Sequence, residues 1–163
     1  MKAIVSASAI ALSLIASAAS AQAVRTEKNM SLELANQIAA ATVAACSASN
    51  YNVTAAVVDR AGTLRALQRA DNAGPHTVGA AQGKAYTSAS ARANTTAMLE
   101  NVQKNPGAAT LVDIPGFLIL GGGVPVKVGN EVIGAVGVGG APGGHLDEQC
   151  ANAGIAKVAE LLK

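Results

Sequence analysis

Side chains able to bind a metal ion or to act as acid–base catalysts are few in this chain, and they stand apart from one another. The sequence has two histidines, His76 and His145, and two cysteines, Cys46 and Cys150. Neither HExxH nor CxxC, two spacings typical of metal sites, occurs. Each histidine precedes or begins a predicted helix, so each is either a single metal ligand or a solvated polar residue at a helix start.

A glycine-rich segment after a predicted strand is the second feature that suggests chemistry. A strand, a glycine-rich loop and a helix N-terminus follow one another around residues 137–144, and such a place could hold a carboxylate or phosphate group. However, Pro142 stands where a dinucleotide-binding fingerprint needs glycine, and neither the phosphate-loop motif nor the hydrolase motif G-x-S-x-G occurs. The alternative is that the glycines let a strand and a helix pack closely. The glycines concerned are Gly134, Gly137, Gly139 and Gly140.

The composition limits the classes of protein that these residues could serve. Of the 163 residues, 50% are hydrophobic, 13% charged and 2% aromatic, which favours one globular domain and excludes a disordered chain. The formal net charge is only +2, and no basic stripe or set of stacking aromatics is present. We therefore expect no nucleic-acid partner.

The N-terminal segment has the pattern of a secretory signal peptide. Lys2 is followed by an apolar run to about Ile15 and then by small residues that end in Ala21-Gln22-Ala23. A membrane anchor is the alternative, but a spanning helix needs about 20 strongly apolar residues, and serines interrupt this run. We predict a signal peptide at 1–23 and one exported domain at 24–163, periplasmic or secreted and without a membrane association after cleavage.

The remaining elements follow from the periodicity of apolar residues. We expect a first helix from Ser31 to Cys46, two helices within 75–98 separated at 92–94, and a final helix that ends near Leu161. Strands are expected at 53–59, 63–69, 117–120, 124–128 and 131–138, with a hairpin turn at Gly129-Asn130. Five strands in two groups predict a mostly antiparallel sheet with helices on at least one face.

Each cysteine falls on the apolar stripe of a terminal helix. The apolar positions of the first helix recur every three or four residues, and Cys46 is one of them. Cys150 belongs to a series with the same spacing in the last helix. An exported protein can form a structural disulfide, whereas two unpaired thiols in the core would fit the same stripes. The residues alone leave both alternatives open.

Four segments with a shared order and spacing resemble a known family. They are 57–62, 84–89, 121–125 and 132–138, the last followed by Asp147-Glu148. Together they resemble the GlcG/HbpS-like haem-binding family, to which the C-terminal domain of PduO-type proteins is also similar. The resemblance implies an α/β (α+β) fold of profilin-like type, with a five-stranded, mostly antiparallel sheet and the first and last helices on one face. It also implies homo-oligomers that bind haem or a related tetrapyrrole.

The resemblance further implies where the ligand binds. It places the ligand surface near His76, a candidate axial ligand of the haem iron, and near Lys84, a candidate partner for a propionate, with Tyr86 and Thr87 beside them. His145 is the second choice as iron ligand. Because aromatic residues are scarce, we expect a shallow site shared between subunits.

Two more expectations follow from this resemblance. Since it puts the first and last helices beside each other, it favours a Cys46–Cys150 disulfide. For function, the chain is expected to store, sense or scavenge haem, and the alternative is an enzyme or enzyme accessory. That alternative would act on a small carboxylate, such as a 2-hydroxy acid, at the loop from Gly139 to His145. No catalytic residue is assigned.

Overall fold

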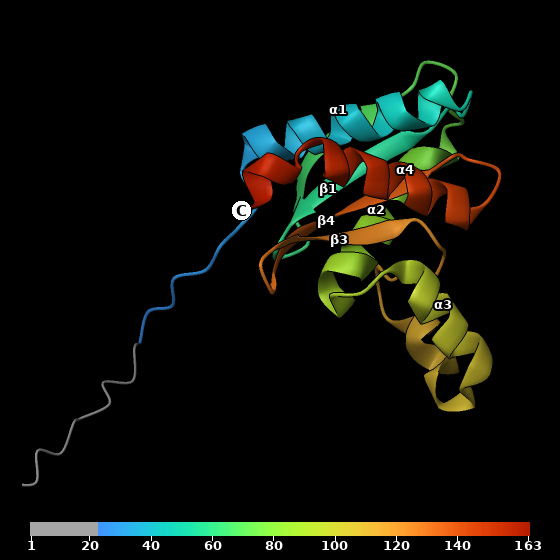
Figure 1. Ribbon diagram of the computed structural model, residues 1–163. Coiled ribbons are helices and arrows are strands. Elements are labelled where there is room, and N and C mark those ends of the chain that lie inside the picture. Colours follow the sequence, from blue (N-terminus) through green and yellow to red (C-terminus); the bar gives the residue numbers. More distant parts are fainter. Residues whose placement is uncertain (1–22) are drawn as a thin grey trace, which may run out of the picture.

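Four antiparallel strands form the sheet that positions the rest of the chain (Figure 1). The computed structural model describes residues 23–163, so the predicted signal peptide lies, except for Ala23, outside the described residues. The strands are β1 (Thr54–Asp59), β2 (Leu64–Arg69), β3 (Gly123–Val128) and β4 (Glu131–Gly139), in the order β2-β1-β4-β3. The two β-hairpins therefore join through β1 and β4, which pair along their length.

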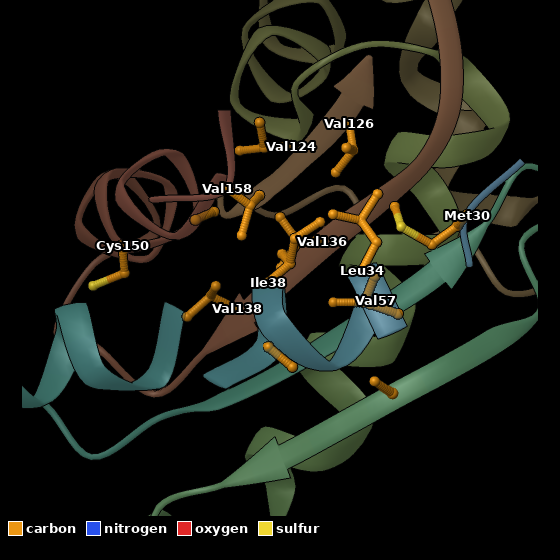
Figure 2. Packing of buried hydrophobic residues seen from close by; sticks show 14 of the residues in the cluster. Met30, Leu34, Ile38, Val57, Val124, Val126, Val136, Val138, Cys150 and Val158 are labelled. Atoms are coloured by element: carbon orange, nitrogen blue, oxygen red, sulfur yellow. The ribbon is translucent and has the colours of Figure 1, made fainter. Parts of the chain in front are cut away.

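Two helices cover one face of this sheet. Helix α1 (Leu32–Ala48) begins at the N-cap Ser31, whose hydroxyl accepts a hydrogen bond from the Leu34 amide at 3.1 Å. Helix α4 (Gly144–Lys157) runs beside it, and together they bury the main hydrophobic core against alternate residues of the strands (Figure 2). The first and last helices thus lie on one face, as the resemblance implied.

Helix α2 (His76–Ala91) covers the opposite face of the sheet and contacts β1, β3 and β4. Its contact with β4 is close because β4 presents glycine there. A Cβ added to Gly137 would lie 2.1 Å from the Ala81 carbonyl oxygen and 2.4 Å from the Ala85 nitrogen. The glycine-rich end of β4 therefore serves the packing of helix against strand, which is the second of the two interpretations above.

The expected fifth strand at 117–120 is wrong, and the sheet formed by the described part of the chain has four strands. The Leu118 amide donates to the Thr87 hydroxyl of α2 at 2.7 Å, and the Leu120 amide donates to the Leu118 carbonyl at 2.9 Å. These two backbone N–H groups therefore donate to a side chain of α2 and within the segment's own turn, and not to a neighbouring strand. The segment that precedes it forms helix α3 (Thr95–Lys104) and a 3₁₀ helix, η1 (Pro106–Asp113).

A disulfide joins the two helices of the first face. Cys46 of α1 and Cys150 of α4 are both buried, and their Cα atoms lie 5.3 Å apart. One turn before Cys46 in α1 and one turn after Cys150 in α4, Thr42 packs against Gly154, where an added Cβ would lie within 3 Å of the threonine. After α4, a 3₁₀ helix, η2 (Ala159–Leu162), ends the chain. In residues 23–163, none of the helices combines the length and apolar character needed to span a membrane.

Candidate functional site

An open cleft of about 550 Å³ lies where the N-termini of α2 and α4 approach each other. Its size falls in the usual range for small-molecule sites, about 300–1,000 Å³. The glycine-rich connection from β4 to α4 forms one wall, and the start of α3 with the end of the 117–120 segment forms another. The lining residues are His76, Ala80, Lys84, Thr96, Leu99, Leu120, Gly121, Gly139, Gly140, Ala141, Pro142, Gly143, Gly144, His145 and Asp147.

A buried ion pair forms the floor of this cleft. The Lys84 ammonium donates to Asp147 Oδ2 at 2.8 Å and to the Val138 carbonyl oxygen at 2.9 Å. The two charged side chains are 5% and 4% exposed, so solvent screens their attraction only weakly. The pair joins α2 to α4 across the end of β4 and thereby fixes the distance between the two helix N-termini that border the cleft.

Asp147 also holds the wall of the cleft in place. Its Oδ1 atom accepts a hydrogen bond from the Ala141 amide at 3.0 Å, within the glycine-rich connection. Burial raises the pKa of Asp147 above its ordinary value, while the Lys84 hydrogen bond and charge and the Ala141 amide oppose this rise. The carboxylate is therefore held in its charged form mainly by Lys84, at a place where desolvation favours the neutral form.

The two histidines border the same cleft from different helices. His76 is the first residue of α2 and His145 the second of α4, and both are exposed. The N-cap residues of these helices, Pro75 and Gly143, form no side-chain capping hydrogen bond. The first turns of both helices line the cleft, so the positive ends of their dipoles border it.

The structure separates Tyr86 and Thr87 from this cleft, although the sequence grouped them with His76 and Lys84. The Tyr86 ring lies between Gly62 and Gly116, meets the edge of Phe117 at 6.2 Å between ring centres, and lines a different surface groove. Thr87 is fully buried, and its hydroxyl donates to the Gly83 carbonyl at 2.8 Å. Because the same hydroxyl also accepts from the Leu118 amide, Thr87 links α2 to the 117–120 segment.

Sequence reasoning did not assign Asp147 or the apolar wall of the cleft to the site. In the sequence, Asp147 follows one of the segments that carry the resemblance, but nothing local connects it with Lys84, 63 residues earlier. Thr96 is held in the wall because its hydroxyl donates to Glu148, which also accepts from Asn94 at 2.7 Å. Among residues 23–163 there is no cluster of three or more histidine, cysteine or acidic side chains that could hold a metal ion.

Comparison with known proteins gives the family. The sequence profile of the HbpS-like family, described as haem-degrading proteins, matches residues 30–156. The chain belongs to the HbpS-like family. This HbpS-like chain is also similar to the protein GlcG of Escherichia coli strain K12, with 39% identity over 114 residues that cover 70% of this chain and 84% of GlcG.

Two solved structures agree with the fold described above. The chain resembles a double mutant of HbpS from Streptomyces reticuli with a TM-score of 0.79 and 36% identity, over 94% of this chain and 98% of that one. A complex of PduOC with haem has a TM-score of 0.70 at 23% identity, over 78% of this HbpS-like chain and 94% of the other. At that identity the likeness is one of fold.

Proposed function

We propose that this protein binds haem or a related tetrapyrrole in the cleft between the N-termini of α2 and α4. The observation that carries the proposal is that His76 and His145, the two histidines of the chain, border one cleft although they lie on different helices. Imidazole is a common axial ligand of haem iron. Membership of a family described as haem-degrading supports the same conclusion.

The residues of the cleft fit such a group. Leu99, Leu120 and Pro142 offer apolar contacts to a macrocycle, and the two exposed imidazoles can approach an iron from the rim. Lys84 lines the floor and offers a positive charge to a propionate. When bound, the iron would supply redox chemistry, and the chain would orient the macrocycle and exclude water from one of its faces.

We also propose that the protein works outside the cytoplasm as a homo-oligomer. The signal-peptide pattern at 1–23 and the paired cysteines support export. The open cleft borders Leu120, which is 49% exposed, and the apolar side chains of Val112 and Ile114 are also exposed. A second copy that covers these side chains would complete the shallow site. Light scattering of the protein with and without hemin tests this, and a monomer in both states would refute it.

Titration of the purified domain with hemin tests the haem proposal. We expect a shifted Soret band at micromolar protein, and we expect both His76→Ala and His145→Ala to change its position or to weaken binding several-fold. Tyr86→Phe is the matched control, because Tyr86 lies outside the cleft, and it should leave the spectrum unchanged. An unshifted Soret band in the unaltered protein would rule out haem and favour the alternative function, action on a small carboxylate.

A further inference from the structure

A smaller cavity lies at the C-terminal end of α2, apart from the cleft. Its volume is about 160 Å³, and four of its lining side chains carry hydrogen-bond donors: Arg60 of the β1–β2 turn, Tyr86 and Ser90 of α2, and the C-cap Arg92. Two of these are guanidinium groups, and within residues 23–163 no acidic side chain lines the cavity. The cavity therefore offers donors and positive charge to an anion.

Arg92 has a backbone conformation that arginine seldom adopts. Its φ of 56° and ψ of 32° lie in the left-handed region, which glycine reaches without a steric cost. The side chain is exposed and takes part in none of the ion pairs that the described residues form. A strained residue whose charge has no partner in this part of the chain points to a role of the side chain in binding.

Arg60 is held in a fixed orientation at the same cavity. Its Nε atom lies 3.2 Å from a Glu27 oxygen, and its Nη1 atom lies 3.4 Å both from a Glu131 oxygen and from the Val132 carbonyl oxygen. Among the described residues these are the acceptors of the Arg60 side chain, so the two donors of Nη2 stay free for a ligand.

The charge balance makes both guanidinium groups necessary. Glu27 and Glu131 compensate the charge of Arg60, although neither lines the cavity. The C-terminal end of α2 adds partial negative charge to this place. Arg92 therefore supplies the net positive charge, and Arg60 supplies the oriented donors.

An apolar groove of about 420 Å³ adjoins the cavity, and the two share Gly62 and Tyr86. Leu64 and Tyr86 line this groove and are 43% and 37% exposed, while Val58 lines it from the buried sheet. Helix α2 leaves room there, since a Cβ added to Gly79 would meet no atom within 4 Å. Apolar surface thus continues directly from a cavity that is lined by donors.

We propose that this cavity and groove bind an amphipathic anion, a small molecule with a phosphate or carboxylate group on an apolar chain. The anionic group contacts Arg92 and Nη2 of Arg60, because guanidinium groups form charge-assisted hydrogen bonds with both oxyanions. The apolar chain lies in the groove beside Leu64. No residue lines both this site and the cleft, so the inference does not rest on the proposed haem function.

Isothermal titration calorimetry of the purified domain tests the site. The probes are octyl phosphate and octanoate, with inorganic phosphate and acetate as the same head groups without the chain. We expect at least one octyl probe to bind at least about tenfold more tightly than its head group alone, because the chain leaves water. The tighter octyl probe identifies the oxyanion. Absence of binding by both octyl probes at millimolar concentration would overturn the inference.

Variants of Arg92 test the anionic end. Arg92→Ala should weaken binding of the octyl probe at least about tenfold, because a charged donor is lost. Arg92→Gly should lose affinity equally and yet raise the melting temperature, because glycine relieves the backbone strain. Arg65→Ala is the matched control, since Arg65 is an exposed arginine of β2 that lines neither the cavity nor the groove. Equal losses in Arg92→Ala and Arg65→Ala would reduce the effect to general charge attraction and refute the site.

Gly79→Leu tests the apolar end. Leucine favours the helix and fits the open space at Gly79, so the variant should fold while its side chain fills the groove. Its affinity for the octyl probe should fall toward that for the head group alone. A melting temperature no lower than that of the unaltered protein shows that the variant is folded, and an unchanged affinity for the octyl probe would then place the chain elsewhere and overturn the inference.

The cleft histidines separate this site from the haem proposal. The variant His76→Ala/His145→Ala should bind the octyl probe as tightly as the unaltered protein, since neither histidine lines the cavity or the groove. Protein loaded with hemin should bind it equally. If the octyl probe displaces hemin, the two ligands share one site and the separate site is refuted. A shifted Soret band without binding of the octyl probe would leave the haem proposal standing alone.

Discussion

Replacement of Gly137 by alanine tests whether the close contact between α2 and β4 sets the geometry of the cleft. The new Cβ would lie 2.1 Å from the Ala81 carbonyl oxygen and 2.4 Å from the Ala85 nitrogen, and both are backbone atoms of α2. An ordinary contact of about 3.5 Å would require α2 to move away by roughly 1.4 Å. Overpacking of this kind costs about 1–3 kcal/mol and sometimes more.

The unfolded chain offsets only part of this cost. Alanine restricts the unfolded state more than glycine does, which favours folding by about 0.4–1 kcal/mol where the backbone tolerates alanine. We therefore expect Gly137→Ala to lower the free energy of unfolding by about 2 kcal/mol. Because α2 carries Lys84, the shift should also lengthen the 2.8 Å contact with Asp147 and weaken hemin binding several-fold.

Urea denaturation and hemin titration of the same preparations provide the measurement. Gly79→Ala is the matched control, since Gly79 lies within α2 but an added Cβ meets no atom within 4 Å. It should stabilise the protein by about 0.5–1 kcal/mol, because alanine favours the helix, and it should leave hemin affinity unchanged. Equal stability of Gly137→Ala and the unaltered protein, or equal destabilisation by both variants, would refute the packing argument.

Three further predictions concern the two helices of the first face. Removal of the disulfide by Cys46→Ser/Cys150→Ser should lower the free energy of unfolding by up to about 5 kcal/mol, because the bridge closes a loop of 104 residues. Mass measurement after alkylation without reductant checks that the bridge forms, and two free thiols would contradict it. Thr42→Val should stabilise the protein by about 1 kcal/mol in urea denaturation, because the buried Thr42 hydroxyl has no hydrogen-bond partner within residues 23–163; a loss of stability would mean that the larger methyl group does not fit beside Gly154. The pKa of Asp147 is higher in the folded than in the unfolded protein, so the protonated carboxyl group favours the folded state at low pH. This contribution to the free energy of unfolding is lost as the pH rises through the pKa of Asp147 in the folded protein. Urea denaturation of the unaltered protein and of Asp147→Asn across this pH range should show a smaller fall in the free energy of unfolding for the variant. If the free energy of unfolding falls equally with pH in both proteins, Asp147 is not the group responsible.

Local sequence patterns predicted most of the elements but not the sheet as a whole. The stripe that ends at Cys46 gave the first helix, and the Gly129-Asn130 pair gave the hairpin turn, where Gly129 has a φ of 59°. The segment 117–120 is as apolar as a buried strand, and the pattern alone predicted one. Its backbone donors instead reach Thr87 of α2 and its own turn, and no local signal carries that information.

For the candidate site, the sequence supplied the scarce ligand-type side chains, but the fold decided which of them meet. Tyr86 and Thr87 lie two and three residues after Lys84, yet the helical twist of α2 turns Tyr86 to another groove and Thr87 into the interior. His145 was only a second choice, yet it borders the same cleft as His76. The resemblance of segments indicated the family, and the comparisons with known proteins show it.

The sequence by itself determined most of the elements, the boundaries of α1 and α2 to within two residues, and the small set of side chains able to do chemistry, whereas α3 extends to Lys104, beyond the expected 98. These follow from interactions between neighbours three or four residues apart, or two apart in strands, which every stretch of chain carries with it. Only the tertiary structure decided that β1 pairs with β4 and that Lys84 meets Asp147 across 63 residues. Such pairings depend on which apolar faces bury each other, and in this protein the close approach that β4 allows at Gly137 brings Lys84 to the floor of the cleft.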